Sequence, residues 1–283
     1  MAGAVHVRHL KREDISWAIA LTDTEAWGYA AADFERLLDL EPEGVFLAQA
    51  GGARVGITAT TTYGPLAYIG AVIVEPGWRG KHVGDALMRA CLDFLDHRGV
   101  ESARLNAYLN VIPFYERLGF RREFENHRFA GWHEGRAVPG VRLAREDDLA
   151  AMAELDRRYF GAERTKLLRR LLQEFPATSL VVDDAGDVAA FAFGNLGGGS
   201  CEIGPFVCPP KRGADAEALF DAMCAAADAP CALSVPAPNA RGLEIARRAG
   251  LHDAFPTMRM VRGSAAHGGD PTGIFAIAGL EKG

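Results

Sequence analysis

Two patterns of hydrophobic and polar residues occur along this chain, one typical of strands and one typical of helices. The clearest case lies between residues 68 and 99. Ile69–Val74 is an apolar run rich in β-branched residues, which predicts a buried strand that a Pro-Gly pair ends. From Val83 onward, apolar residues recur three and four positions apart, which predicts a helix with one buried face, ending at Gly99. This stretch therefore predicts a strand, a turn and a helix.

The turn between the predicted strand and helix contains the candidate binding residues. It reads Arg79-Gly80-Lys81-His82-Val83-Gly84. The first N–H groups of a helix lack intrahelical partners and carry partial positive charge, and glycines let the main chain approach a phosphate closely. Arg79 and Lys81 add full charges, so the pattern predicts a diphosphate site. The glycine spacing excludes the triphosphate-binding loop and the dinucleotide fingerprint. An ordinary turn with solvated basic residues is the alternative.

The same order of predicted elements occurs twice along the chain. Val5–Ile15 is echoed by Val141–Leu149, and the later segments repeat at the same offset of roughly 130 residues. Each copy predicts a strand, helices, two strands, a central strand, a helix, a strand, a helix and a strand, which is a mixed α/β pattern. Glycines and a proline between residues 131 and 140 indicate a linker. We therefore predict two domains, residues 1–135 and 136–283.

Composition narrows the possible partners. The chain has 283 residues, of which 49% are apolar and 24% charged, as in ordinary globular proteins. Its net charge of −6 argues against a nucleic-acid partner and mildly favours a cationic substrate such as an amine. The five cysteines show no metal-ligand spacing, so we expect reduced, mostly buried thiols and no metal; a zinc site or a disulfide is the alternative.

The sequence shows neither the pattern of a signal peptide nor that of a membrane-spanning segment. The first residues carry charges where a signal peptide needs an apolar core, and no run approaches the roughly 20 apolar residues of a membrane span. We expect a cytoplasmic protein without a membrane partner. The oligomeric state cannot be predicted from these patterns.

Two motifs carry a resemblance to a known family. Arg79–Gly84, after a strand that ends in Val74-Glu75-Pro76, resembles the pyrophosphate loop of the GNAT acetyltransferases, Arg/Gln-x-x-Gly-x-Gly/Ala. His82 stands where that family usually has glycine, but histidine is tolerated in left-handed turns. Pro113–Phe120 resembles the second signature of the family, Pro-Phe-Tyr-Glu-x-Leu-Gly-Phe. Over nearly its whole length the chain is similar to bacterial tandem GNAT proteins whose C-terminal half is degenerate.

This resemblance implies a fold and an activity. The fold would be two tandem GNAT-like α/β domains, each with a mixed, mostly antiparallel central sheet flanked by helices. The activity would be that of an N-acetyltransferase, which moves an acetyl group from acetyl-CoA to a primary amine on a small molecule or peptide. A non-catalytic acyl-CoA sensor and an interaction protein are the alternatives.

The resemblance also implies roles for individual residues. Tyr115 would be the general acid that protonates the leaving thiolate, and Tyr68, where the family often has glutamate, is a weaker catalytic candidate. The second copy keeps only Gly213 of the loop and has Ala246 in place of Tyr115, so we expect coenzyme binding in the N-terminal half. The residues expected to bind acetyl-CoA are Val72, Val74, Arg79, Gly80, Lys81, His82, Val83, Gly84, Asn110 and Phe114.

Overall fold

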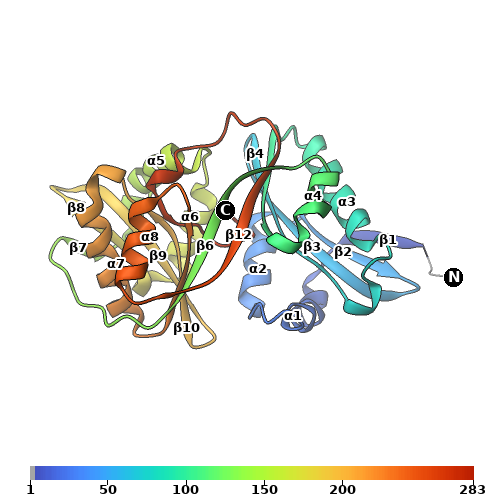
Figure 1. The fold of residues 1–283 in the computed structure, drawn as a ribbon, viewed down its shortest axis with the longest axis horizontal. Helices are drawn as coiled ribbons and strands as arrows, with labels where there is room; N and C mark the ends of the chain where they lie inside the picture. Colours follow the sequence, from blue (N-terminus) through green and yellow to red (C-terminus); the bar gives the residue numbers. More distant parts are fainter. Residues whose placement is uncertain (1–3) are drawn as a thin grey trace. The chain divides into compact units, whose positions relative to one another are not determined.

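The computed structural model describes residues 4–283, which form two compact units (Figure 1). The first unit extends to Leu105 and includes Lys282. The second unit extends from Asn106 to Glu281 and includes Gly283. No helix within residues 4–283 combines the length and the apolar character needed to cross a membrane.

The first unit is built on the strand order β1-β2-β3-β4-β5. Neighbouring strands from β1 to β4 are antiparallel, and β5 is parallel to β4. The last three residues of β5 belong to the second unit. The elements are β1 (Val5–His9), α1 (Ile15–Asp23), α2 (Ala31–Leu40), β2 (Val45–Ala50), β3 (Ala53–Tyr63), β4 (Leu66–Val74), α3 (Val83–His97) and β5 (Ser102–Tyr108).

The two faces of β3 receive different helices because successive side chains of a strand point to opposite sides. Ile57 and Ala59 belong to the apolar cluster formed with α1 and α2. Thr58, between them, accepts a hydrogen bond from the Cys91 thiol of α3 at 3.6 Å. The helix α3 buries the apolar stripe predicted from its sequence, including Leu87 and Cys91. The sheet of the first unit is therefore covered by helices on both faces.

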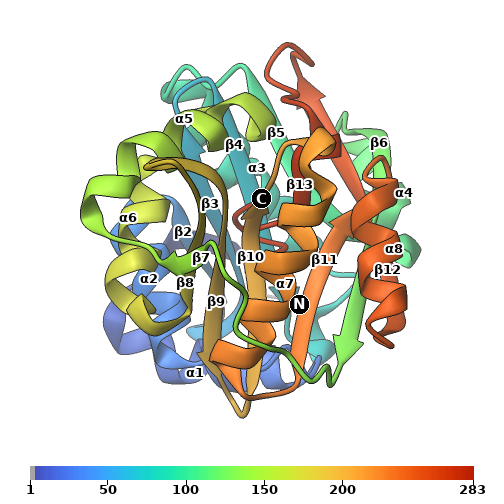
Figure 2. The same ribbon diagram turned by 90° about the vertical axis from the view of Figure 1, so that its left-hand side faces the viewer.

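The second unit has the strand order β12-β6-β11-β10-β9-β8-β7, with β13 paired to β10. Figure 2 shows α7 lying over this sheet. Its elements are α4 (Ile112–Arg117), β6 (Arg121–Gly131), β7 (Val141–Leu143), α5 (Leu149–Phe160), α6 (Thr165–Glu174), β8 (Ser179–Asp184), β9 (Asp187–Gly197), β10 (Ser200–Val207), α7 (Gly213–Ala227), β11 (Cys231–Pro236), α8 (Ala240–Arg248), β12 (His252–Gly263) and β13 (Ile274–Ala276).

The predicted order of elements is found in both repeats, and the fold is the expected mixed α/β fold with a mostly antiparallel sheet. The predicted domain boundary between residues 135 and 136 stays a prediction, and the division into compact units falls between residues 105 and 106, inside the first repeat. The reason is β6, the last strand of the first repeat, which pairs with β11 on one side and with β12 on the other. Both partners belong to the second repeat, so β6 is built into the sheet of the second unit.

The five cysteines are all free and buried, as expected from their apolar surroundings. Burial raises the pKa of Cys91 to about 12, and it raises the pKa of Cys208 to about 12 as well. Both thiols therefore stay protonated at neutral pH and are poor nucleophiles.

Each repeat begins with the same ion pair. In the first, both terminal nitrogens of Arg8 donate to Asp14, at 2.7 and 3.0 Å. In the second, Arg142 donates to Asp148 at 2.7 and 2.8 Å. The Arg8 guanidinium, aided by the Lys11 main-chain N–H, holds the pKa of the Asp14 carboxyl well below its usual range. The Arg142 guanidinium similarly lowers the pKa of Asp148.

These lowered pKa values predict a loss of stability in acid. Above pH ~5, both carboxyls are ionised in the folded and the unfolded chain, so the pairs contribute fully. As the pH falls below that value the unfolded chain takes up the protons first, and the contribution is lost towards the lower folded pKa. Asp14→Asn should cost about 1–3 kcal/mol at pH 7, because it replaces a buried carboxylate, which accepts hydrogen bonds from Arg8, by a neutral amide, and should flatten the acid dependence. Urea unfolding between pH 7 and pH 3 measures both effects.

Glu154→Gln is the control for this experiment. Glu154 also pairs with an arginine, Arg157, at 2.7 Å, but both side chains are more than half exposed. An exposed pair in solvent contributes little to stability. An unfolding curve changed as much by Glu154→Gln as by Asp14→Asn would contradict the role assigned to the buried pair.

Candidate functional site

The first unit contains an opening between two parallel strands. Their hydrogen-bonded register covers only Leu66–Tyr68 of β4 and Ser102–Arg104 of β5, although β4 continues to Val74. The pairing of β4 with β3 also shifts at this point, where Ala71 has a φ of +49°. This shift is a β-bulge, which bends a strand and leaves main-chain groups unpaired. Within residues 4–283, β4 after Tyr68 therefore has no hydrogen-bonded register with β5.

Two predicted binding residues lie on this part of β4. Val72 and Val74 are half-buried, whereas Ile73 between them is buried in the core shared with α1 and α2. Tyr68, the weaker catalytic candidate, is 2% exposed and is paired with Arg104 at the last register position before the strands part. Opposite Tyr68 on β3, the hydroxyl of Thr61 is buried without a hydrogen-bond partner. The point of separation is thus lined by buried polar groups.

Two residues of the basic turn after β4 have a left-handed conformation. Gly80 has a φ of +74°, and a Cβ placed on it would meet no atom within 4 Å. His82 is left-handed, with φ 61° and ψ 15°, and is the N-cap of α3. The expectation that histidine would tolerate the position of the family's glycine is therefore confirmed. Ala86 makes the first helical hydrogen bond, to the His82 carbonyl, so the N–H groups of Val83, Gly84 and Asp85 have no intrahelical acceptor.

The charged side chains of the turn are exposed and already have partners. Arg79 donates to the Val74 carbonyl at 3.1 Å and to Glu25 at 2.5 Å. Lys81 donates to the Gly77 carbonyl at 2.9 Å, and its ammonium lies 5.0 Å from the centre of the Trp78 ring. These side chains are held beside the turn, and Arg79 would exchange a carboxylate partner for any phosphate.

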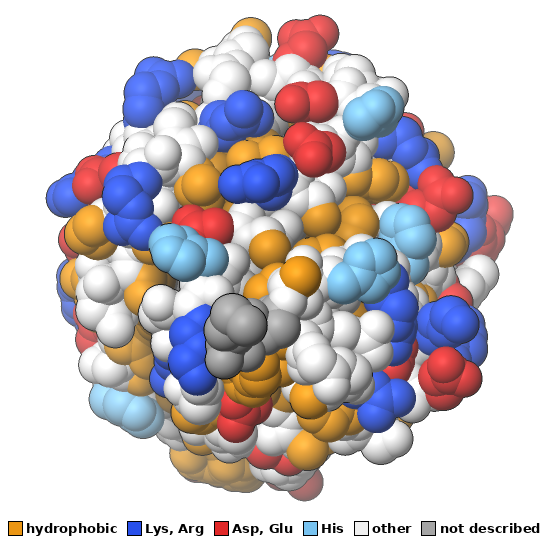
Figure 3. Space-filling model, turned by 90° about the vertical axis from the view of Figure 1, so that its right-hand side faces the viewer, with side chains coloured by type: hydrophobic (Ala, Val, Ile, Leu, Met, Phe, Trp, Pro, Cys, Tyr) orange, Lys and Arg blue, Asp and Glu red, His pale blue; other side chains and the backbone are white. Residues whose placement is uncertain are grey.

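One acidic group also lies in the first turn of the helix. The Asp85 carboxylate is 3.0 Å from His82 Nδ1, on the side chain of the N-cap residue. On the face drawn in Figure 3, basic and acidic side chains are interspersed, so this face offers no continuous basic surface of the kind a nucleic acid needs. The absence of a nucleic-acid partner stays a prediction.

The second predicted motif lies in the other unit. Pro113 occupies the first turn of α4, and Gly119, just past its end, has a φ of +86°. Tyr115 is 8% exposed. Its ring makes edge contacts with Phe114 and Phe120, with centroids 5.0 and 6.0 Å away. The aromatic cluster fixes the ring, because its neighbours on both sides are themselves part of α4 or of the turn that ends it.

The predicted residues therefore fall into two groups. The first unit holds Tyr68, Val72, Val74 and the turn Arg79–Gly84, and the second unit holds Asn110, Phe114 and Tyr115. Asn110 lies in an exposed single turn of 3₁₀ helix between β5 and α4. In the first unit the strand, turn and helix follow one another as predicted from the sequence. In the second unit the turn and the helix do so.

A polar network in the second unit was not predicted. Both terminal nitrogens of Arg128 donate to the Glu202 carboxylate, at 2.7 and 2.6 Å, and Nη1 also reaches Ser234 Oγ at 3.4 Å. Asn126 donates to Asn106, which donates to the Leu280 carbonyl. Glu202 occupies the position of the second repeat that corresponds to Tyr68, and its pairing with Arg128 argues against a role as a free base. No local pattern could have revealed this network, because Arg128 comes from the first repeat.

Comparison with known proteins decides the family. A model described as the acetyltransferase (GNAT) family matches residues 13–120, and one described as an acetyltransferase (GNAT) domain matches residues 152–276. The chain belongs to the GNAT acetyltransferases. It is a tandem member of that family, with one such domain in each repeat, and the protein is an acyltransferase.

Two curated relatives of this GNAT protein extend over most of its length. It is 26% identical to the holothin acyltransferase of Pseudoalteromonas sp. (strain SANK 73390) over 275 residues, which cover 94% of this chain and 89% of the relative. It is 21% identical to the uncharacterized N-acetyltransferase YitH of Bacillus subtilis (strain 168), with 81% and 82% covered.

Solved structures share the fold. A putative acetyltransferase from Pyrococcus horikoshii superposes with a TM-score of 0.84 at 21% identity and covers 99% of this chain and 96% of its own. A GCN5-related N-acetyltransferase from Sphaerobacter thermophilus gives a TM-score of 0.66 at 19% identity, with 92% and 95% covered. The fold of this chain is thus shared by other proteins.

Proposed function

We propose that the first repeat binds acetyl-CoA and transfers its acetyl group to a primary amine. The observation that carries this proposal is the opening of β4 from β5, followed directly by the glycine-containing turn and the free N–H groups of α3. An extended pantetheine chain has amides that can pair with a strand edge. A diphosphate would be bound by the main-chain N–H groups at the start of α3, with the charged side chains of Arg79 and Lys81 in the same turn.

The fit depends on how the acidic groups of the turn are held. Asp85 would repel a diphosphate, but His82 lies within hydrogen-bonding distance of its carboxylate. The Arg79 guanidinium would exchange the Glu25 carboxylate for a phosphate oxygen of the coenzyme. The residues present can therefore accommodate the coenzyme, with Val72 and Val74 beside its pantetheine arm.

The chemical step needs two proton movements. The amine, with a pKa of about 10 as an ammonium, must lose a proton before its nitrogen attacks the thioester carbonyl. The new amide bond forms as the carbon–sulfur bond breaks, and the leaving thiolate of CoA takes a proton. We assign that donation to Tyr115, the only tyrosine of the α4 motif. Tyr68, at the point where the strands part, is assigned to the path by which the amine loses its proton.

The proposal is tested by ligand-induced stability together with turnover. Acetyl-CoA at about 100 times its dissociation constant should raise the free energy of unfolding by ~2.7 kcal/mol. Incubation with acetyl-CoA and a panel of small amines and peptide N-termini should release free CoA thiol with at least one acceptor. Stabilisation without thiol release across the panel would favour an acyl-CoA sensor. The absence of both effects would leave an interaction protein and contradict the proposal.

A further inference from the structure

The second repeat contains the same opening as the first, but a strand of its own chain fills it. In the second unit β10 and β11 are parallel and paired only at Cys201–Glu202 with Cys231–Ala232, while β10 continues to Val207 and β11 to Pro236. The next strand of the chain to pair with β10 is β13, which is antiparallel to it at Phe206 and Val207. Among residues 4–283, β4 of the first repeat pairs only with β3 and β5.

The segment around β13 is hydrogen-bonded to both sides of this opening. The N–H of Cys208, just past β10, donates to the Gly273 carbonyl at 3.0 Å. The N–H of Ile277, just past β13, donates to the Ser234 carbonyl of β11 at 3.0 Å. The side chain of Asn239, at the start of α8, donates to the Ile274 carbonyl at 2.9 Å. One extended peptide thus bridges the two strands that part.

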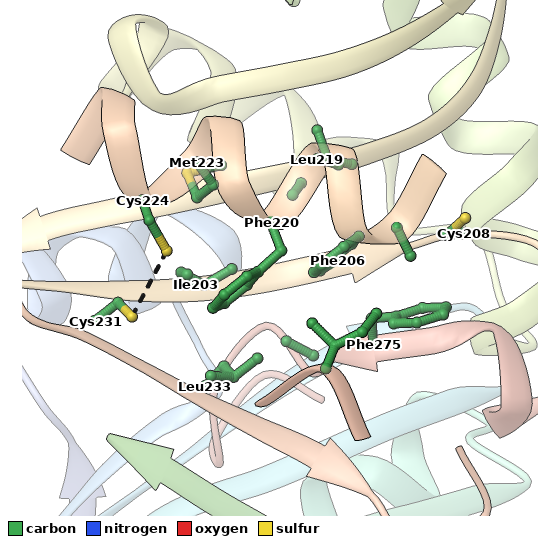
Figure 4. Close-up of a cluster of buried hydrophobic side chains, with 14 of the residues drawn as sticks. Ile203, Phe206, Cys208, Leu219, Phe220, Met223, Cys224, Cys231, Leu233 and Phe275 are labelled. Carbon is green, nitrogen blue, oxygen red and sulfur yellow. Dashed lines mark hydrogen bonds between the residues drawn. The ribbon is translucent and has the colours of Figure 1, made fainter. Parts of the chain in front are cut away.

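The side chains of this segment are part of the core of the second unit. Phe275 is 1% exposed, and its ring centroid lies 5.2 Å from that of Phe206 on β10. Figure 4 shows Phe206 and Phe275 facing one another beneath Leu219 and Phe220 of α7. The approach to β10 is so close that a Cβ on Gly204 would lie 1.9 Å from the Ile277 carbonyl oxygen. No room is left for a second extended molecule beside β10.

The turn that would receive a diphosphate is also reduced in this repeat. Eight residues separate β4 from α3, whereas five separate β10 from α7. The helix α7 begins directly after a turn of 3₁₀ helix, and Asp215 in its first turn pairs with Arg212. Arg212 also pairs with Asp184 at 2.6 Å. Of the two basic side chains in this turn, Lys211 and Arg212, the second is therefore flanked by two carboxylates.

We infer that residues 273–277 act as an internal peptide ligand in the coenzyme slot of the second repeat, so that this repeat binds no acyl-CoA. This inference rests on the proposed function only in taking the strand opening as the place of the pantetheine arm. Main-chain groups of β13 replace the pantetheine amides on β10, and buried apolar side chains replace the rest of the arm. The second repeat is thereby kept as a structural partner whose slot is permanently closed.

The first experiment measures how many molecules of acetyl-CoA the full-length chain binds. Isothermal titration with acetyl-CoA should give one equivalent per chain for the unchanged protein and none for Gly84→Glu. Gly213→Glu, which puts the same charge at the start of α7, should still bind one equivalent. Two equivalents in the unchanged protein would overturn the inference. So would an equivalent that survives Gly84→Glu and disappears when Gly213→Glu is added.

The second experiment does not depend on acetyl-CoA binding in the first repeat. Hydrogen exchange of the full-length chain should show the amides of Cys208 and Ile277 exchanging about 100-fold or more slowly than in an unstructured peptide, with or without saturating acetyl-CoA. Slowed exchange in residues 70–74 only when acetyl-CoA is present would support the proposed function. Absence of any heat with protected Cys208 and Ile277 would contradict the proposed function alone. Fast exchange at these two amides, or loss of their protection on adding acetyl-CoA, would overturn the inference.

Discussion

Replacing Gly84 by glutamate is expected to abolish acetyl-CoA binding. Gly84 lies in the first turn of α3, next to the N–H groups assigned to the diphosphate. A carboxylate about 4 Å from one phosphate charge costs about 4 kcal/mol at the effective dielectric constant of a protein surface, which corresponds to roughly a thousandfold loss of affinity. The helix itself should tolerate the change, because an acidic side chain in the first turn suits the helix dipole. Isothermal titration with acetyl-CoA measures the effect.

Two controls separate charge from size and position. Gly84→Gln introduces a side chain of the same shape without the charge, and it should weaken binding much less than Gly84→Glu. Gly213→Glu places the carboxylate on the corresponding helix of the second repeat, where an added Cβ lies 3.1 Å from Arg241 Nε, and binding should be unchanged. Normal heats of binding for Gly84→Glu, with an unchanged melting curve, would show that acetyl-CoA binds elsewhere.

Replacing Tyr115 by phenylalanine is expected to lower kcat about tenfold or more and to leave the KM for acetyl-CoA nearly unchanged. The substitution removes only the hydroxyl that we assign as proton donor to the thiolate, and general acid catalysis typically contributes a hundredfold or more. The ring is packed between Phe114 and Phe120, so phenylalanine keeps the aromatic contacts and the fold. Steady-state release of the CoA thiol, with the acceptor found in the amine panel, measures both constants.

Tyr159→Phe is the matched control for this experiment. Tyr159, on α5, is also a buried tyrosine of the second unit, 3% exposed, and it lies outside both the basic turn Arg79–Gly84 and the motif Pro113–Phe120. Its replacement should leave kcat unchanged within about twofold, as expected for a residue without a part in proton transfer. A Tyr115→Phe enzyme with unchanged turnover would remove Tyr115 from the catalytic residues, whereas equal losses in both variants would indicate a structural effect.

Much of the candidate site could be predicted from short stretches of sequence. The apolar run before Pro76 predicted β4, and the apolar spacing after Val83 predicted α3, whose bounds are Val83–His97. The conformation of the turn was also predictable, because Gly80 and His82 are residues that adopt positive φ. These features depend on neighbours within a few positions, and the same holds for Pro113 and Gly119 at the two ends of α4.

The bulge in β4 and the opening from β5 were not predictable in this way. Ala71 has no intrinsic preference for its φ of +49°. The bulge lies in the part of β4 that pairs with β3 on one side and has no register with β5 on the other. The network of Arg128 and Glu202 likewise joins residues 74 positions apart, and each of them alone resembles an ordinary solvent-facing charge.

The sequence by itself determined the repeat, the order of the strands and helices and the place of the basic turn, because periodicity, helix ends and turn residues act locally. Only the tertiary structure decided which strands became neighbours. It placed β6 of the first repeat between β11 and β12 of the second, and it set β13 in the opening beside β10. The physical reason is that strands pair through main-chain N–H and C=O groups, which every residue but proline offers alike. A pattern of side chains therefore specifies a strand and its buried face, whereas its partner is selected by the packing of the whole chain.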